Sequence, residues 1–223
     1  MPESRSRPSA ESDPERRNWV WLCLQTVMRL IFAACLRYRA YGHEELKGNT
    51  GVLFVINHQS FLDPLLVGLP LSRPICFLAR HSLFRIPVIG WILRSTHVLP
   101  INREAASTGA LREMIARLQA GFWVGIFPEG TRSSDGSLGR LKPGFVALLR
   151  RAAVPVCPVG IAGSRNVLGR GTLFPRFAKV CVVFGPSISI AEIQASLSIG
   201  EEHLLKLIHE RLASTIREAE VRR

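Results

Sequence analysis

A histidine and an aspartate five positions apart are the clearest candidates for chemistry in this sequence. They lie in the segment Asn57-His58-Gln59-Ser60-Phe61-Leu62-Asp63-Pro64, directly after the apolar run 51–57. An imidazole accepts a proton near neutral pH, and a carboxylate that holds one ring N–H leaves the other nitrogen free as a general base. The spacing allows a turn that folds Asp63 back onto His58. Asp63 before Pro64 is also a suitable helix N-cap, and one carboxylate can serve both purposes.

A second polar cluster follows the apolar run 122–127 and reads Phe127-Pro128-Glu129-Gly130-Thr131-Arg132-Ser133-Ser134-Asp135-Gly136. Its glycine lets backbone N–H groups approach a ligand, and its arginine suits bidentate contact with phosphate. Lys142-Pro143-Gly144 then begins a predicted helix, whose N-terminus attracts anions. The same residues also fit a polar surface turn closed by Asp-Gly. The chain has no Gly-x-Ser-x-Gly elbow, no Walker A motif and no Gly-x-Gly-x-x-Gly, so the corresponding hydrolase and nucleotide-binding folds lack support.

Short apolar runs alternate with helical segments over most of the chain, which predicts a single α/β domain. We expect helices at 64–69, 104–120, 142–153 and 200–221, and strands at 51–57, 75–79, 97–101, 122–127, 155–162 and 178–184. Several of these strands are apolar on both faces, as strands covered by helices on both sides are. The predicted fold is therefore a mixed, largely buried sheet flanked by helices. Both polar clusters follow a predicted strand, where α/β domains place reacting groups.

The N-terminal part of the chain has a different composition. Residues 1–16 are polar and are expected to form a disordered tail, residues 17–42 a membrane-associating helix, and residues 43–223 the folded domain. Within the apolar stretch 19–36, Gln25, Thr26 and Arg29 share one narrow stripe. We favour an amphipathic helix in the membrane interface; a tilted spanning helix and a helix packed on the domain's own core are the alternatives. The aromatic and basic residues at its two ends suit the wet edge of a bilayer: Trp19, Trp21, Arg37, Tyr38, Arg39 and Tyr41.

The net charge of +12 indicates an anionic partner. No acid occurs between Asp63 and Glu104 or between Asp135 and Glu192, although both windows are rich in arginine. An arginine-biased composition explains arginine in place of lysine but not the missing acids, so the windows predict an anion-attracting surface. Aromatic residues are not interleaved with the basic ones, and we expect no nucleic-acid partner. With 47% hydrophobic residues, the composition also excludes disorder and a multi-pass membrane protein.

The cysteines give no sign of a metal site or a disulfide framework. None forms a Cys-x-x-Cys pair, and each stands alone among apolar neighbours: Cys23, Cys35, Cys76, Cys157 and Cys181. We expect buried, reduced thiols in a cytosolic setting.

Four segments in order resemble the motifs of the glycerolipid acyltransferases, in particular 1-acylglycerol-3-phosphate acyltransferases of the bacterial PlsC type. They are Asn57-His58-x4-Asp63, the Arg80 to Arg103 segment with Pro87-x-x-Gly90-Trp91, Phe127-Pro128-Glu129-Gly130-Thr131-Arg132, and Val154-Pro155-Val156-x-Pro158-Val159. The resemblance covers about residues 45–190, and its motifs fall within 57–159.

The resemblance implies that His58, oriented by Asp63, deprotonates a lysophospholipid hydroxyl, which attacks the thioester of acyl-CoA or an acyl carrier protein and forms phosphatidic acid. Residues expected to bind the acceptor are Arg80, Glu129, Gly130, Thr131 and Arg132, joined by Lys142 at its helix start. No metal and no cofactor beyond the acyl donor is expected. The partners are then a membrane lipid acceptor, the acyl donor and an anionic membrane surface, with monotopic attachment at the cytoplasmic face of the cell membrane.

Two positions depart from the family's usual pattern. Ser82 stands where the family often has Glu, and His97 where it commonly has Gly. Both fall in the segment credited with shaping the acyl or acceptor pocket. They leave the chemistry unchanged, and the alternative is the same transfer to another lysophospholipid or a lyso-aminolipid.

Overall fold

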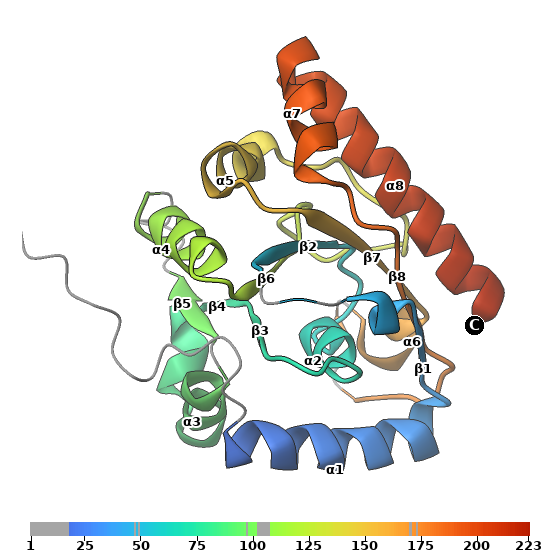
Figure 1. Ribbon diagram of the computed structural model, residues 1–223. Helices are drawn as coiled ribbons and strands as arrows, with labels where there is room; N and C mark the ends of the chain where they lie inside the picture. Colours follow the sequence, from blue (N-terminus) through green and yellow to red (C-terminus); the bar gives the residue numbers. More distant parts are fainter. Residues whose placement is uncertain are drawn as a thin grey trace, which may run out of the picture.

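The computed structural model describes residues 18–46, 48, 50–96, 98–101, 108–169, 171–172 and 174–223 (Figure 1). The predicted tail at 1–16 lies outside the described residues. A six-stranded mixed sheet forms the centre, in the order β1-β8-β7-β2-β6-β3. Its strands are β1 (Arg39–Tyr41), β2 (Val52–Ile56), β3 (Ile75–Cys76), β6 (Trp123–Ile126), β7 (Val156–Ala162) and β8 (Cys181–Phe184). Neighbouring strands run parallel except for β7 and β8, which are antiparallel.

Helices cover both faces of this sheet (Figure 1). One face carries α4 (Thr108–Gln119), α5 (Val146–Ala152), α7 (Ile190–Ile199) and α8 (Glu201–Arg222), and the other carries α1 (Trp19–Leu36), α2 (Asp63–Gly68) and α6 (Ser164–Leu168). A hydrophobic core lies on each face of the sheet, and alternate residues of β2 point into one or the other. Leu53 and Val55 pack in the core under α4, α5, α7 and α8, Phe54 and Ile56 pack in the core on the opposite face, and all four are fully buried. The prediction of a mixed sheet covered on both sides is confirmed.

One predicted strand is divided between two sheets. The run 75–79 supplies β3 of the main sheet and β4 (Leu78–Arg80), which pairs with β5 (Leu99–Ile101) in a separate two-stranded sheet. Phe77 lies between them and its ring lies against Gly125, where no Cβ would fit. Phenylalanine is favoured in strands, but Phe77 belongs to neither strand. Its side chain instead packs against Gly125 at the point where the chain leaves the main sheet.

The region after β4 holds elements that periodicity did not predict. The 3₁₀ turn η2 (His81–Arg85) leads into α3 (Pro87–Ser95), which begins with proline at its first position. Gly90 lets α3 approach this turn, because a Cβ there would overlap the carbonyl group of Phe84. Among the described residues, the sequence analysis did not predict β1, η1 (His43–Glu45), η2, α3, α6 and α7.

The other predicted helices are present with shifted ends. α4 starts at Thr108, and the predicted first residues 104–107 lie outside the described residues, as does His97 before β5. The helix predicted at 142–153 begins as the 3₁₀ turn η3 (Pro143–Phe145) and continues as α5. α2 and α8 begin and end within one residue of their predicted ends.

Two of the three polar side chains in the stripe of α1, those of Gln25 and Arg29, bind the rest of the domain, whereas Thr26 is exposed and donates to the Leu22 carbonyl of its own helix at 2.8 Å. The side-chain amide of Gln25 donates to the carbonyl oxygens of Leu69 and Leu71, both at 2.9 Å, and Arg29 Nε donates to Leu69 at 3.0 Å. The outward face is apolar and includes Trp19, Leu22, Val27, Leu30 and Ile31. By length and composition alone, α1 is also long and apolar enough to cross a membrane.

Three of the six residues expected at the edge of a bilayer are exposed, namely Trp19, Arg37 and Arg39, and the other three are wholly or partly buried. Trp21 is buried, and Arg39 and Tyr41 belong to β1. The hydroxyl of Tyr38 donates to the Leu66 carbonyl at 2.7 Å, and burial raises its pKa. A position next to an apolar run does not reveal that Tyr38 bonds to α2 or that Arg39 and Tyr41 pair with β8.

The cysteine prediction is right for three residues and wrong for one. Cys76, Cys157 and Cys181 are buried free thiols, but Cys23 is exposed on α1 and Cys35 is half-buried. Cys23 has apolar neighbours in the sequence because the whole outer face of α1 is apolar, and not because it lies in a core.

Candidate active site

The loop that carries His58 starts at a defined point of the sheet. β2 ends at Ile56, and the side-chain amide of Asn57 then replaces the next pair of strand hydrogen bonds: Asn57 Nδ2 donates to the Ile161 carbonyl at 2.9 Å, and the Ile161 N–H donates to Asn57 Oδ1 at 2.7 Å. The oxygen and the nitrogen of the Asn57 side-chain amide both bind β7 in place of the backbone, and the chain turns away from the sheet directly afterwards.

The predicted turn brings Asp63 back onto His58. Nδ1 of His58 lies 2.9 Å from Oδ2 of Asp63. The same carboxylate oxygen accepts the backbone N–H groups of Gln59 and Ser60, each at 2.7 Å. Asp63 is fully buried at the start of α2. Since a carboxylate oxygen faces Nδ1, the ring proton is assigned to Nδ1 and Nε2 keeps its lone pair.

The alternative of Asp63 as an N-cap is wrong in its detail. The residue before the helix is Leu62, which makes no side-chain cap, and Pro64 occupies an early position of α2. The carboxylate of Asp63 binds N–H groups of the preceding loop instead of the helix's own. These hydrogen bonds hold residues 59–63 in a tight turn, and the same carboxylate holds the imidazole of His58.

A serine from a different part of the chain completes the surroundings of Asp63. Ser164, the first residue of α6, is fully buried and donates its hydroxyl to Oδ1 of Asp63 at 2.7 Å. Ser60 adds a second link, because its hydroxyl donates to the Leu168 carbonyl at the end of α6 at 2.8 Å. Both oxygens of Asp63 therefore have partners, as a buried carboxylate requires.

Aromatic rings fix the plane of the imidazole. The His58 ring stacks on Phe127, with centroids 4.0 Å apart, and Phe127 stacks in turn on Phe77. The His58 side chain remains 19% exposed, so the ring is held on one side and open on another. An oriented and partly open imidazole with a free nitrogen can act as a general base.

Glu129 ties the second polar cluster to the first. Its Oε1 accepts the backbone N–H of His58 at 2.8 Å and its Oε2 accepts the N–H of Gly139 at 3.0 Å. The side chain is buried, and this burial raises the pKa of Glu129 although both hydrogen bonds lower it. The Ser133 N–H donates to the His58 carbonyl at 2.7 Å, so both backbone groups of His58 are held by the segment 129–133.

Gly130 and Lys142 meet at the mouth of this second loop. Gly130 adopts a φ of +71°, and a Cβ there would lie 2.6 Å from Nζ of Lys142. The backbone N–H of Lys142 donates to the Pro128 carbonyl at 2.9 Å, which keeps the two segments together. Thr131 and Lys142 are exposed. The N–H of Gly130 donates to the Phe127 carbonyl at 3.0 Å, so the exposed ammonium group of Lys142 is the group at this point that can meet an anion.

Two predicted residues remain, Arg132 and Arg80. The guanidinium of Arg132 lies over the ring of Phe61, 3.6 Å from its centroid, so Arg132 is held beside the His58 loop. Arg80 ends β4 in the two-stranded sheet, where its backbone pairs with Ile101; its side chain is outside the description. The contacts described thus link six of the predicted residues, and Thr131 is an exposed neighbour of Gly130 in the same loop: His58, Asp63, Glu129, Gly130, Arg132 and Lys142.

Sequence reasoning missed four contributors to the site. Ser164 orients Asp63, Phe127 orients the imidazole, Phe61 holds Arg132, and Gln59 donates to the Gly136 carbonyl at 3.0 Å. Ser164 had a usable signal: it comes two residues after the predicted strand 155–162, at the same kind of strand end as His58. Phe127 and Phe61 had none, since single aromatic residues are expected in any core.

Comparison with known proteins gives a consistent set of relatives. The sequence model described as Acyltransferase matches residues 37–162. A chloroplastic 1-acyl-sn-glycerol-3-phosphate acyltransferase of Brassica napus is 35% identical over 56% of this chain and 36% of its own length. A 1-acyl-sn-glycerol-3-phosphate acyltransferase of Borreliella burgdorferi is 25% identical over 83% of this chain and 74% of its own length. The chain spans less than half the length of the first plant relatives that it matches.

A solved structure shares the fold. The crystal structure of the 1-acyl-sn-glycerophosphate acyltransferase PlsC of Thermotoga maritima matches with a TM-score of 0.76 and 25% identity, over 89% of this chain and 79% of that chain. The match extends well beyond the residues of the family model, so the arrangement of the sheet and its helices is common to both proteins.

Proposed function

Because the chain belongs to the acyltransferase family, we propose that it is an O-acyltransferase that transfers a fatty acyl group to the free hydroxyl of a 1-acylglycerol-3-phosphate, forming phosphatidic acid. Relatives with this named activity support the acceptor and the reaction class. The observation that carries the proposal is the 2.9 Å contact between Nδ1 of His58 and Oδ2 of a fully buried Asp63.

The chemistry follows from that contact. Nε2 of His58 takes the proton of the acceptor hydroxyl while its oxygen attacks the thioester carbonyl carbon, and the ester C–O bond forms as the C–S bond breaks. The thiolate that leaves receives the proton from the imidazolium, and Asp63 stabilises this cation through Nδ1–H. Acid–base catalysis of this kind contributes about 10²–10⁴-fold, so orientation of the two substrates supplies much of the remaining acceleration.

Basic groups around the second loop support an anionic acceptor. Arg132 and Lys142 flank Gly130 and Thr131, and together with Arg80 they would hold the glycerol phosphate. Glu129 acts here as a positioning residue, since its two oxygens accept N–H groups of His58 and Gly139. The donor is a thioester, acyl-CoA or an acylated carrier protein, and the reaction as written uses no metal or further cofactor.

The face of α1 supports attachment to a bilayer. Apolar side chains point away from the domain while two side chains of the polar stripe are used inside it, which leaves an outer surface suited to lipid. In this proposal α1 forms the monotopic membrane segment, and the chain from β1 onward, residues 39–223, forms the acyltransferase domain, because β1 is a strand of its central sheet. The domain would then work at the cytoplasmic face of the cell membrane, where its acyl donors are found.

Thiol release from acyl-CoA in anionic micelles tests the proposal. We compare lysophosphatidic acid, a neutral lysolipid and no acceptor, each with the native protein, with His58→Ala and with His203→Ala. His203 is an exposed histidine of α8 and serves as the matched control. Release should require lysophosphatidic acid and His58, and His203→Ala should behave as the native protein. Ordinary turnover by His58→Ala would show that the mechanism is wrong.

The identity of the acceptor is decided in the same assay. Release that depends on His58 but prefers another lysophospholipid or a lyso-aminolipid would keep the mechanism and change the substrate. Ser82, exposed in η2, would then be the first residue to exchange for glutamate. Arg132→Ala should raise KM for lysophosphatidic acid more than it lowers kcat, because its contact is with the bound phosphate.

A further inference from the structure

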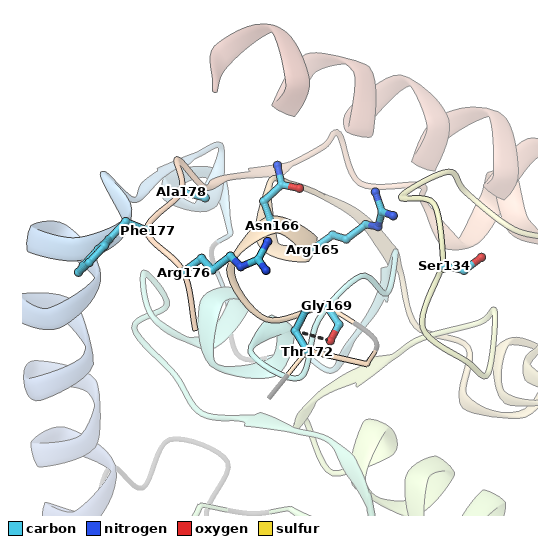
Figure 2. Close-up of a pocket in the computed structure, with 8 residues that line it drawn as sticks. All are labelled: Ser134, Arg165, Asn166, Gly169, Thr172, Arg176, Phe177 and Ala178. Atoms are coloured by element: carbon cyan, nitrogen blue, oxygen red, sulfur yellow. Dashed lines mark hydrogen bonds between the residues drawn. The ribbon is translucent and has the colours of Figure 1, made fainter. Parts of the chain in front are cut away.

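A basic pocket lies beside the catalytic loop, on the connection between β7 and β8. It has a volume of about 500 Å³ and is lined by Ser134, Arg165, Asn166, Thr172, Arg176 and Phe177, with backbone from Gly169 and Ala178 (Figure 2). Two arginines and one asparagine thus line one hollow together with two hydroxyl residues, of which Thr172 donates to the Gly169 carbonyl at 2.9 Å. No carboxylate is among its lining residues.

The two arginines come from neighbouring pieces of backbone. Arg165 is on α6, and the N–H of Arg176 donates to the Val167 carbonyl of the same helix at 2.9 Å. Figure 2 shows Arg165 extending toward Ser134, whereas Arg176 lies on the side of Phe177. Among the described residues, no ion pair with Asp or Glu involves either arginine. Their charges are therefore available to an anion that enters the pocket.

Two large apolar side chains stand next to this pocket and face solvent. Phe174 is 80% exposed and Phe177 is 84% exposed, and in Figure 2 Phe177 points away from the pocket toward α1. The chain that follows them is attached to α1, because the Val180 N–H donates to the Leu36 carbonyl at 3.1 Å. Exposed phenylalanines beside arginines, on a segment bonded to the end of α1, are what a protein presents to the interface of an anionic bilayer.

The pocket is also joined to the catalytic loop. Ser164, which precedes Arg165, donates to Asp63, and a Cβ at Gly136 would lie 3.6 Å from Cδ of Arg165. α6 therefore carries one residue that orients the Asp63 carboxylate and, next to it, one that lines the pocket. A molecule bound to Arg165 lies next to the segments that hold His58.

We propose that Arg165 and Arg176 form a binding site for the phosphate group of an anionic membrane phospholipid, with Phe174 and Phe177 inserted among its acyl chains. The inference rests on the membrane attachment in the proposed function and adds a specific lipid contact to it. The site seats the domain on the bilayer with α6, and hence the catalytic loop, next to the headgroup layer. It is separate from Arg132 and Lys142, which face the transferred acceptor.

Vesicle co-sedimentation tests the proposal with full-length protein. We use phosphatidylcholine vesicles with and without phosphatidylglycerol, and compare the native protein with Arg165→Gln/Arg176→Gln and with Arg151→Gln/Arg217→Gln. Arg151 on α5 and Arg217 on α8 are exposed, so the second variant removes the same charge elsewhere. Partition of the first variant into anionic vesicles should fall by about 30-fold at low salt, and that of the control much less.

Further variants separate charge, shape and insertion. Arg165→Lys/Arg176→Lys should recover most of the anionic-vesicle binding, because the ammonium groups keep the charge. Phe174→Ser/Phe177→Ser should weaken binding to neutral and anionic vesicles alike. Equal loss in the pocket variant and in the control would overturn the proposal, since it would show a dependence on net charge only.

Acyl transfer with short-chain, monomeric substrates separates this proposal from the proposed function. The pocket variant Arg165→Gln/Arg176→Gln and the control Arg151→Gln/Arg217→Gln should both transfer the acyl group at the native rate in the absence of vesicles. A raised KM for acyl-CoA, with vesicle binding unchanged, would assign the pocket to the phosphates of the donor and overturn the lipid site. Failure of the native protein to bind any vesicle would contradict the membrane attachment itself, and the lipid site with it.

Discussion

At the scale of single residues, the site is built from hydrogen bonds that converge on one carboxylate and one backbone position. Asp63 accepts from two backbone N–H groups, from Ser164 and from the imidazole. His58 has its own N–H and carbonyl held by Glu129 and Ser133. Asp63 and Phe127 orient the imidazole, and both are held in turn by further contacts. The imidazole can therefore accept and release a proton without moving.

Ser164→Ala tests the outer part of this arrangement. It leaves Oδ1 of Asp63 buried without its donor, which should lower the free energy of unfolding by about 1–3 kcal/mol. Because Ser164 acts on the imidazole only through Asp63, kcat should fall by about 10- to 100-fold while KM for both substrates stays nearly unchanged. Steady-state kinetics and denaturant unfolding measure the two effects.

Ser196→Ala is the control for this change, since Ser196 is a buried serine of α7 away from the site. A loss of stability in Ser164→Ala with native kcat would show that the serine is structural only.

Glu129→Gln tests the buried carboxylate that links the two loops. Burial raises the pKa of Glu129, so the folded state binds its proton more readily than the unfolded state does. The contribution of Glu129 to stability is therefore fully present at low pH and decreases as the pH rises through its folded-state pKa. Glutamine does not titrate, so the stability advantage of the native protein over Glu129→Gln should shrink as the pH rises above 4.5, the ordinary pKa of a glutamate.

Chemical unfolding of both proteins across this range measures that difference. A difference that stays constant, or grows with pH, would mean that the hydrogen bonds from His58 and Gly139 outweigh burial.

At the scale of elements, α1 differs from an ordinary surface helix because apolar side chains occupy both its buried and its exposed side. Val20, Trp21, Phe32 and Leu36 are its buried residues, and two polar side chains between them bind the end of α2. Its other face is apolar although the domain does not cover it. α3 continues this surface, since Trp19 and Trp91 have ring centroids 6.0 Å apart and Asn18 donates to the Ser95 carbonyl.

Leu30→Ser and Leu36→Ser separate the two faces of α1. Leu30 is 69% exposed, so its loss should leave the free energy of unfolding nearly unchanged and weaken partition into vesicles by about 10-fold. Leu36 is buried, and its replacement should cost at least about 2 kcal/mol of stability. Vesicle co-sedimentation and thermal unfolding check both. Equal vesicle binding by Leu30→Ser and the native protein would place the outer face of α1 away from the bilayer.

At the scale of the whole molecule, the central strands separate two cores and place three cysteines out of reach. Cys157 and Cys181 lie on strands with helices packed over them, and burial raises their pKa to about 12 and about 11. Cys76 is also buried and its pKa is raised. Thiolates are the reactive form, so these three side chains react only when the fold opens.

Thiol labelling of the native protein at neutral pH should therefore show one fast cysteine. Cys23 is exposed on α1 and should react first, Cys35 more slowly, and the three buried cysteines only in denaturant. Cys23→Ser should remove the fast phase. Fast reaction of Cys157 in the native state would contradict the packing of β7 between the two helical layers.

The sequence by itself determined the elements with strong periodicity and the two loops that carry polar residues. The strands 51–57, 122–127 and 155–162 are apolar on both faces, so only a sheet covered on both sides could bury them. The spacing from His58 to Asp63 suits one turn, and their contact is local in the chain. These features depend on neighbours in the sequence, which is why they could be predicted.

Only the tertiary structure decided what lies opposite these loops. Ser164 reaches Asp63 across 101 positions of the chain, and Glu129 reaches His58 across 71. The direction of the polar stripe on α1 depends in the same way on α2, whose carbonyl groups need donors that its own backbone does not supply. Such partners are set by how elements pack, and the order of residues along one element carries no record of it.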